Sequence, residues 1–374
     1  MHDSFRPNSG GHGDIAPRAP ARSSRRANLL LALGTLLVSL AVFELGYRIA
    51  TGMPAFKFVN WRHEQLQMDR LGEHGMVDPV LGWSVRAGFS SEGYNTLEHG
   101  VRRNFKETSV RTGGILAVGD SFAEGWEVGD DESWPAHLER ITGIPVINVG
   151  VSAYGTDQIL LRAERFLPIV KPKILIVGFL EFDIIRAGFS HFGAPKPYFT
   201  LERGELRYHP PAPFEPNAPS GVFADAAGMI RTPLGYSALA DHLLSRLTPN
   251  YWYGKDNIQF HKVSTDVVGV TCALLARVKK QADQSKTRML LFMQYYAAII
   301  VENEKPTENA QRVMACAASA GIEVVDQFGP LRAVAAADPN AVWSYYINKG
   351  EMFTHMTSKG NEHAAELLAK VVRK

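Results

Sequence analysis

The chain has 374 residues, which allows one large domain or two to three smaller ones. With 45% hydrophobic and 21% charged residues it has an ordinary globular composition, which excludes disorder, collagen, a coiled coil or a multi-span membrane protein as descriptions of the whole. The net charge is +2, and residues 1–26 carry +3 of it (five Arg, two Asp), which leaves −1 for the remainder. Such a nearly neutral body argues against a nucleic-acid partner, because nucleic-acid binders normally present a basic face.

The first fifty residues predict a basic leader followed by a membrane-spanning helix. Residues 1–26 contain few large apolar side chains, so we expect a disordered leader. Residues 27–43 carry no charge, and a helix of that length rises about 26 Å, slightly less than the ~30 Å of a hydrocarbon core. Glu44 and Arg48 follow, and snorkelling of these side chains would extend the span to residues 27–50.

Arginines before the apolar run predict its orientation. Four of the five lie just before it: Arg18, Arg22, Arg25 and Arg26. Because positive charge is retained in the cytoplasm, the N-terminus should lie inside and the body outside. A cleaved signal peptide with a small-x-small site at Ser39–Ala41 is the alternative, although the long basic leader and the apolar residues past Ala41 favour an uncleaved anchor.

The chain has two cysteines, too few for a disulfide framework or a cysteine-rich zinc site. Outside the cytoplasm Cys272 and Cys316 could pair with each other. The alternative, which we favour from the sequence, is two separate small residues on different helices.

After residues 51–110, a linker and N-terminal extension without clear periodicity, strands and helices alternate. Five short apolar runs predict buried strands: 115–118, 145–149, 173–179, 288–294 and 322–325. Five segments have helical patterns: 132–142, 156–167 (stopped by Pro168), 264–284, 306–320 and 360–372. This alternation predicts an α/β fold of three layers, α/β/α, with a central parallel sheet of about five strands.

Residues 187–262 interrupt the alternation. They are rich in proline and aromatic residues, and the segment 198–208 alternates around Arg203-Gly204, which predicts a hairpin. Long segments inside a compact domain are often functional lids, so we expect a cap over the strand ends, with a decorative insertion as the alternative.

Chemistry is expected at the carboxyl end of the first strand. In a parallel sheet, ligands bind beyond the carboxyl ends of the strands, and a Gly-Asp-Ser tripeptide ending at Ser121 lies there. The lipase elbow Gly-x-Ser-x-Gly is not matched, because Ala123 occupies the last position. A serine nucleophile needs a base. His355, which stands just before the closing helix and hence at the same sheet edge, is the candidate.

Four segments resemble the sequence blocks of the SGNH/GDSL hydrolase family, in the family's order: 118–122, 147–155, 178–183 and 355–364. The resemblance covers roughly residues 113–374 and implies an SGNH-hydrolase or flavodoxin-like domain over 111–374 that uses no cofactor and no metal. The membrane leader resembles envelope-anchored bacterial members, with distant similarity to alginate-type O-acetylation proteins. The implied location is the bacterial inner membrane, crossed once, with a periplasmic catalytic domain.

The resemblance also implies roles for individual residues. Ser121 would be the nucleophile and His355 the general base. One oxyanion donor would be the Ser121 backbone N–H, and a second would come from the second block, at Ala153 or, as the weaker candidate, Gly150.

Two departures from the family pattern affect catalysis. Phe182 replaces the third-block Asn whose amide is a further oxyanion donor, beside the structural Asp183. Met352 stands where the family has the acid that orients the base, so Glu351 is the first candidate for the acid and Asp326 the second.

The resulting hypothesis is an ester hydrolase outside the cytoplasm, acting through an acyl-serine on O-acyl groups, with O-acetyl expected. An O-acetyltransferase of envelope polysaccharide, or a catalytically weakened glycan-binding or scaffold protein, is the alternative. The expected partners are a small acyl ester or acylated glycan and, through the N-terminal helix, a membrane. A metal hydrolase is disfavoured because no spacing of His, Asp and Glu forms a ligand set.

Overall fold

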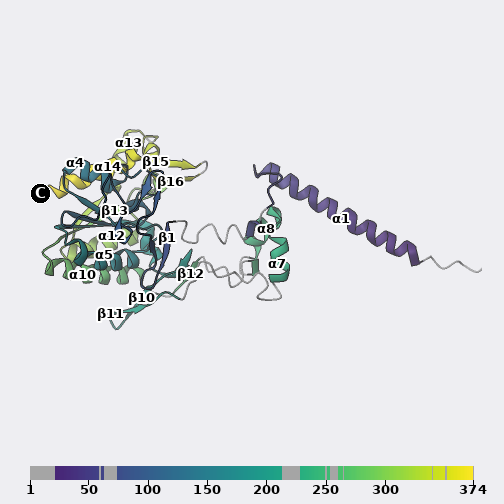
Figure 1. Cartoon of the computed structure of the whole chain (residues 1–374), viewed down its shortest axis with the longest axis horizontal. Helices are drawn as coiled ribbons and strands as arrows, with labels where there is room; N and C mark the ends of the chain where they lie inside the picture. Colours follow the sequence, from purple (N-terminus) through teal and green to yellow (C-terminus); the bar gives the residue numbers. More distant parts are fainter. Residues whose placement is uncertain are drawn as a thin grey trace, which may run out of the picture. The chain divides into compact units, whose positions relative to one another are not determined.

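The computed structural model describes residues 22–58, 60–62, 74–212, 228–248, 251–252, 260–263, 265–338, 340–349 and 352–373. The chain forms two compact units, which are described separately (Figure 1). The first unit comprises residues 1–63 and 223–252, and the second comprises residues 64–222 and 253–374.

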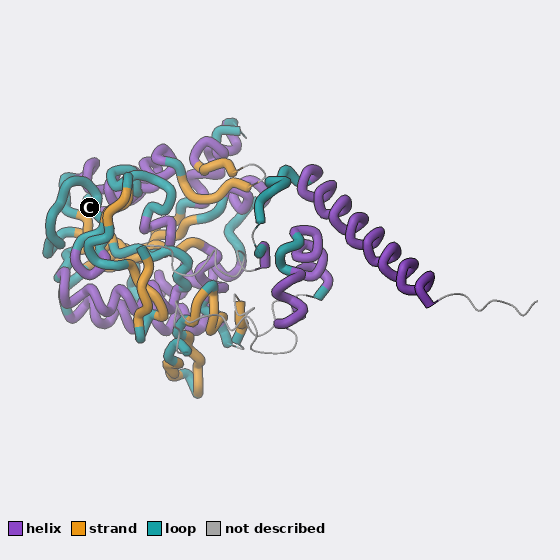
Figure 2. Tube along the Cα trace, turned by 45° about the vertical axis from the view of Figure 1, so that its right-hand side comes forward, coloured by secondary structure: helices purple, strands orange, loops and turns teal. Residues whose placement is uncertain are grey.

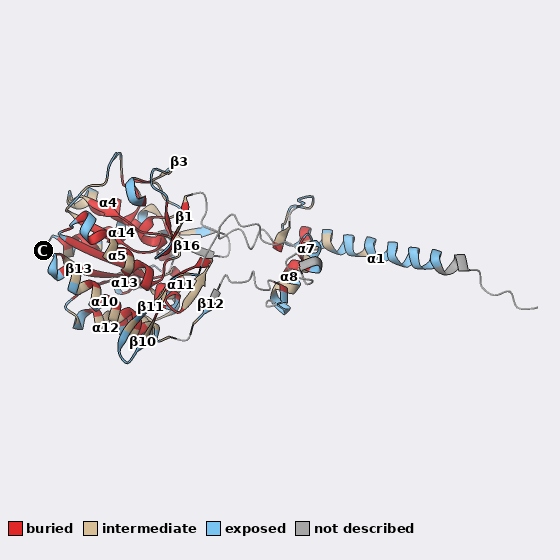
Figure 3. Ribbon diagram, turned by 60° about the horizontal axis from the view of Figure 1, so that its bottom comes forward, coloured by how far each residue is buried: buried red, intermediate tan, exposed pale blue. Residues whose placement is uncertain are grey.

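The first unit contains the long helix α1 (Arg22–Ala50), which is exposed along most of its length (Figure 3). An 18-residue window within its segment Arg26–Ala50 has a mean hydropathy of 2.2, and the segment is long and apolar enough to cross a membrane, a property that a signal sequence shares. The helix begins at Arg22, so the last residues of the predicted disordered leader are helical. The rest of that leader, residues 1–21, lies outside the described residues.

The end of α1 binds a helix from the insertion. Glu44 accepts hydrogen bonds from the Ser237 hydroxyl (2.7 Å) and from the Ala238 backbone N–H (2.8 Å), at the start of α8 (Ala238–Leu247). Arg48 pairs with Glu44 at 2.6 Å and donates to the carbonyl of Tyr236. These two side chains therefore fix a helix to the end of α1, where the sequence suggested only snorkelling. The helices α7 (Gly228–Leu234) and α8 belong to residues 223–252, which are part of the first unit. The rest of the predicted cap belongs to the second unit.

The second unit contains the predicted central sheet. Its strand order is β14-β13-β7-β5-β6, and all neighbours are parallel. The strands are β5 (Ile115–Val118), β6 (Val146–Asn148), β7 (Ile174–Leu180), β13 (Arg288–Gln294) and β14 (Glu323–Asp326). Each coincides within one or two residues with a predicted strand, so the predicted fold class is confirmed.

Helices cover both faces of this sheet (Figure 2). The five predicted helices are α4 (Trp134–Thr142), α5 (Thr156–Val170), α10 (Val267–Gln284), α12 (Glu308–Ser319) and α14 (Ser358–Val372). The helix α4 packs against α14, whereas α10 packs against α5 and α12, on the other side of the sheet in Figure 1. Four further helices were not predicted: α3 (Ser121–Glu124), α6 (Glu181–Arg186), α11 (Ala297–Glu302) and α13 (Phe328–Ala337).

Pro168 does not stop α5, contrary to the prediction, because the helix continues to Val170. A proline in the last turn leaves the carbonyl four residues earlier without its helical donor. Here that carbonyl, of Glu164, accepts a hydrogen bond from the Gln281 side chain of α10 (3.3 Å). The neighbouring helix thus replaces the lost bond.

Short strands complete the unit. The N-terminal extension forms the pairs β1 (Gly75–Asp78) with β2 (Gly82–Val85) and β3 (Ser90–Ser91) with β4 (Tyr94–Asn95), followed by a 3₁₀ turn at Glu98–Gly100. The insertion contributes β8 (Phe189–Phe192), β9 (Ala194–Pro195), β10 (Tyr198–Glu202), β11 (Glu205–His209) and β12 (Phe260–Lys262). A 3₁₀ turn (Val342–Tyr345) leads to β15 (Tyr346–Lys349), which pairs with β16 (Met352–Met356).

The predicted hairpin in the insertion is confirmed. β10 and β11 pair antiparallel with Glu202 opposite Glu205, so Arg203 and Gly204 form a two-residue turn. Both turn residues have positive φ, 54° and 85°, as the twist-matched hairpin turn requires. That the insertion covers the strand ends stays a prediction.

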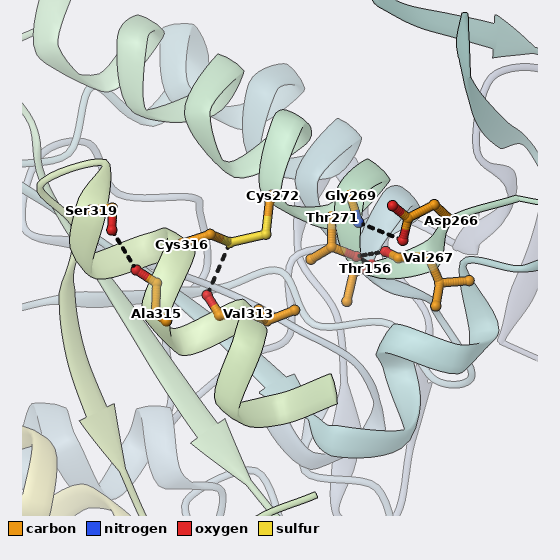
Figure 4. The surroundings of a disulfide bond; sticks show 10 residues. All are labelled: Thr156, Asp266, Val267, Gly269, Thr271, Cys272, Val313, Ala315, Cys316 and Ser319. Atoms are coloured by element: carbon orange, nitrogen blue, oxygen red, sulfur yellow. Dashed lines mark hydrogen bonds between the residues drawn. A yellow bond between two sulfur atoms is a disulfide. The ribbon is translucent and has the colours of Figure 1, made fainter. Parts of the chain in front are cut away.

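The two cysteines form a disulfide, so the expectation of two separate core residues is wrong (Figure 4). The packing of α10 on α12 brings Cys272 and Cys316 to a Cα–Cα distance of 5.9 Å. The bond joins residues 44 positions apart, for which the loss of unfolded-state entropy corresponds to about 4 kcal/mol of stabilisation. Sequence alone could not show that these two helices are neighbours.

Candidate active site

The nucleophile candidate is presented by a tight turn at the end of β5. A Cβ on Gly119 would lie 2.5 Å from the Ala123 Cβ and 2.8 Å from the Gly178 carbonyl oxygen, so this turn needs glycine. Asp120 then caps α3 by accepting the Phe122 N–H at 2.9 Å. Ser121 is therefore the first residue of a short helix at the carboxyl edge of the sheet, with only 5% of its surface exposed.

Ser121 and His355, 234 positions apart, meet in the structure. The His355 Nε2 lies 2.9 Å from the Ser121 Oγ, and the His355 Nδ1 lies 2.8 Å from Oε2 of Glu127. In the neutral tautomer with the proton on Nδ1, the ring donates to the carboxylate and accepts the serine hydroxyl proton. This is the relay of nucleophile, base and orienting acid found in serine hydrolases.

The acid beside His355 is a residue that the sequence analysis missed. Glu127 lies six positions after Ser121, on the loop that follows α3, and adopts a φ of 73°, which a non-glycine residue rarely does. Glu351 lies outside the described residues. Asp326 instead accepts the Phe328 N–H at 3.0 Å, and burial raises the pKa of its carboxyl group.

Two backbone N–H groups are available for an oxyanion. Among the described residues, the N–H groups of Ser121 and Ala153 have no hydrogen-bond partner, and Ala153 has a φ of 65°. The Gly150 N–H, by contrast, donates to the Asn148 side chain at 3.0 Å. A Cβ on Gly150 would lie 2.3 Å from the Glu124 nitrogen, so this glycine allows close packing against α3. The geometry favours Ala153 over Gly150.

Phe182 occupies the third-block position without supplying a donor. Its ring is 37% exposed, lies edge-on to Phe192 with 6.2 Å between centroids, and has the Arg186 guanidinium 5.1 Å from its centroid. The ring is thus only partly packed, which leaves room for a smaller polar side chain.

Beneath this position, a buried charge cluster links the first and third blocks. Arg186 donates to Asp183 (2.7 Å) and to Asp120 (3.1 Å), while Asp183 also accepts the Leu180 N–H at 2.8 Å. Burial, reinforced by the Asp120 carboxylate, raises the pKa of Asp183 well above its usual range, against the opposing effect of Arg186. Asp183 therefore fixes the start of α6 through the Leu180 N–H and the Arg186 guanidinium.

Within the described residues, no group of three or more His, Cys, Asp and Glu side chains is placed to hold a metal ion.

No family model and no curated protein matches the chain. Solved structures that are similar to it include a putative lipolytic protein of the G-D-S-L family from Desulfitobacterium hafniense, 13% identical, with a TM-score of 0.37 and coverage of 70% of this chain and 99% of that one. A lipase/acylhydrolase from Enterococcus faecalis is 13% identical, with a TM-score of 0.39 and coverage of 71% and 96%. An acetyl xylan esterase is 9% identical, with a TM-score of 0.38 and coverage of 69% and 98%. At these scores, the resemblance to the SGNH/GDSL family rests on the four sequence blocks and on the geometry above.

The first prediction distinguishes Glu127 from Glu351 as the acid that orients His355. Glu127→Gln should lower kcat for a p-nitrophenyl ester about 10²–10⁴-fold, because the amide neither orients His355 nor stabilises its protonated form as a carboxylate does. Steady-state kinetics on Glu127→Gln and Glu351→Gln, measured side by side, decide between them. Loss of activity in Glu351→Gln with retention in Glu127→Gln would restore the acid predicted from the sequence.

The second prediction concerns the missing donor. Phe182→Asn should raise the rate of ester hydrolysis, since one oxyanion donor is worth about 10²–10³-fold. Because the ring is partly exposed, the substitution should change the unfolding temperature little. Both quantities are measured on the same protein, with Phe182→Ala as the variant that removes the ring without adding a donor. Equal rates for the Asn and Ala variants would contradict the donor argument.

Proposed function

We propose that this protein is a serine-dependent ester hydrolase that acts on O-acyl groups through an acyl-serine intermediate. The observation that carries the proposal is the contact chain from Ser121 Oγ through the His355 ring to the Glu127 carboxylate, with distances of 2.9 and 2.8 Å. The similar solved structures include esterases and lipolytic proteins, which is compatible with this chemistry.

In the proposed reaction, His355 Nε2 takes the hydroxyl proton while Ser121 Oγ attacks the carbonyl carbon of the ester. The negative charge on the former carbonyl oxygen is stabilised by the N–H groups of Ser121 and Ala153. The alkoxide leaves with the proton from His355, and the acyl group stays on Ser121. A water molecule then gives a proton to His355 and attacks the acyl-serine, which releases the acid and returns the proton to Ser121. Glu127 stabilises the imidazolium in both steps.

The third prediction tests the nucleophile. A fluorophosphonate probe should label the full chain at Ser121, located by peptide mass spectrometry, and Ser121→Ala should abolish both labelling and hydrolysis of p-nitrophenyl acetate. His355→Ala should do the same, and the double variant should be no worse than either single one, because the two residues act as a unit.

Folding of these variants is checked by thermal unfolding, since neither substitution removes a large core side chain. Full hydrolytic activity in a folded Ser121→Ala protein would exclude the acyl-serine mechanism. Absence of labelling in the wild-type chain would favour a non-catalytic binding protein.

We further propose that α1 is an uncleaved anchor and that the second unit lies outside the cytoplasm. The helix is long and apolar enough, and arginines precede its apolar segment. The Cys272–Cys316 disulfide also supports this location, because disulfides persist in oxidising compartments.

The fourth prediction tests this topology. Protease added to intact spheroplasts should digest the chain beyond about residue 60 and spare the N-terminal segment, detected with an N-terminal tag. A cytoplasmic protein of the same cells is the control for intactness. Protection of the C-terminal part would exclude the location, and an N-terminus beginning after Ala41 would indicate cleavage.

A further inference from the structure

A cleft with aromatic walls lies beside the candidate active site. Its volume is about 730 Å³, within the range of ligand sites in proteins. One wall comes from the N-terminal extension and the other from the loop after α3. The side chains that matter are His74, Phe89, Glu92, Tyr94, Trp126 and Glu127.

The cleft and the catalytic residues share their structural elements. Glu127 lines the cleft and at the same time holds His355 through Nδ1. The adjacent residue, Trp126, donates its backbone N–H to the carbonyl of Ser121 at 3.0 Å. A ligand in the cleft would therefore contact Glu127, the residue that holds His355, and would lie against the loop that follows Ser121.

Aromatic rings gather around His74 in this cleft. Its ring centroid lies 4.9 Å from that of Trp126, 5.1 Å from that of Tyr94 and 5.9 Å from that of Phe89. Burial lowers the pKa of His74, which favours the neutral imidazole. No lysine or arginine is among the residues described as lining the cleft, whereas Glu92 and Glu127 are.

The walls are anchored from behind. The Arg102 guanidinium stacks 4.0 Å from the centroid of Tyr94 and donates to the carbonyls of Gly93 (3.1 Å) and Val128 (2.9 Å), one on each wall. The Tyr94 hydroxyl donates to the buried carboxylate of Glu124 on α3. Because backbone of both walls is tied to one buried cation, the cleft is a preformed feature of the fold.

We propose that this cleft binds the saccharide part of an uncharged acylated glycan, while the acyl group faces Ser121. This inference deepens the proposed ester hydrolase function and rests on it. Sugar rings pack their apolar C–H faces on aromatic rings, and their hydroxyls donate to carboxylates, which the cleft supplies. Without a lysine or arginine among its described lining residues, the cleft favours an uncharged glycan over a polyanionic one, and a long acyl chain would desolvate the carboxylates without pairing them.

The fifth prediction uses Trp126→Ala, which keeps the backbone N–H to Ser121. The measured quantity is the ratio of kcat/KM for acetylated xylotetraose to kcat/KM for p-nitrophenyl acetate, with the full chain in detergent. The substitution should lower this ratio at least about tenfold, and the change should appear as a higher KM for the saccharide. Tyr198→Ala is the matched control, since Tyr198 stacks on His209 in the β10–β11 hairpin, outside the cleft, and should leave the ratio unchanged.

Binding is measured independently of turnover. Ser121→Ala protein should bind acetylated xylotetraose, and the Ser121→Ala, Trp126→Ala protein should bind it at least tenfold more weakly. An unchanged ratio and unchanged binding in the Trp126 variants would overturn the proposal. A larger fall in kcat/KM for p-nitrophenyl octanoate than for the saccharide would also overturn it. Failure of fluorophosphonate labelling would instead contradict the hydrolase function, and the binding measurement would still decide whether the cleft takes a glycan.

Discussion

The candidate site depends on one buried arginine behind the loop that follows Ser121. Arg102 is fully enclosed and donates to the carbonyls of Glu124, Gly125 and Val128, while Asp130 accepts from its Nε. Removing such a cation would leave several buried carbonyls without donors, a loss of several kcal/mol. These bonds hold the loop in which Glu127 adopts its unusual backbone conformation and reaches His355. The same bonds attach the N-terminal extension, so the acid and the aromatic cleft have a common support.

The sequence predicted those parts of the fold that local patterns determine. β7 and β13 are buried apolar runs, and the hairpin at Arg203 and Gly204 follows from turn chemistry, so each is recognisable without tertiary information. Residues 74–103 of the N-terminal extension show no periodic pattern of apolar residues, because irregular hydrogen bonds to Arg102 and Asp130 hold this segment together. Likewise, the disulfide and the continuation of α5 past Pro168 both depend on α10 being a neighbour.

The site was predictable to the extent that its motifs are local. Ser121 follows a recognisable strand, and His355 precedes a recognisable helix, so the common sheet edge could be anticipated. The acid could not be anticipated, because the family pattern points to residues near the base and Asp326 stands at a strand end, whereas Glu127 lies on the loop that follows Ser121. The available signal was that Glu127 lies close to Ser121 in the sequence. Its contact with His355 depends in addition on the positive φ of Glu127 and on the position of β16.

Phe182 and the cleft together bear on how such a site selects its substrate. With a ring where the family has an amide donor, the oxyanion would be stabilised by two backbone N–H groups, and small esters that bind nowhere else would react slowly. Binding energy from a remote part of a substrate can be used to orient the reacting ester and to exclude water. A saccharide held by Trp126 and its neighbours would supply that energy next to Glu127, where water exclusion also strengthens the attraction between the carboxylate and the imidazolium. Under the proposed arrangement, the missing donor would make activity conditional on filling the cleft, and selectivity for glycan esters would follow from weak intrinsic catalysis.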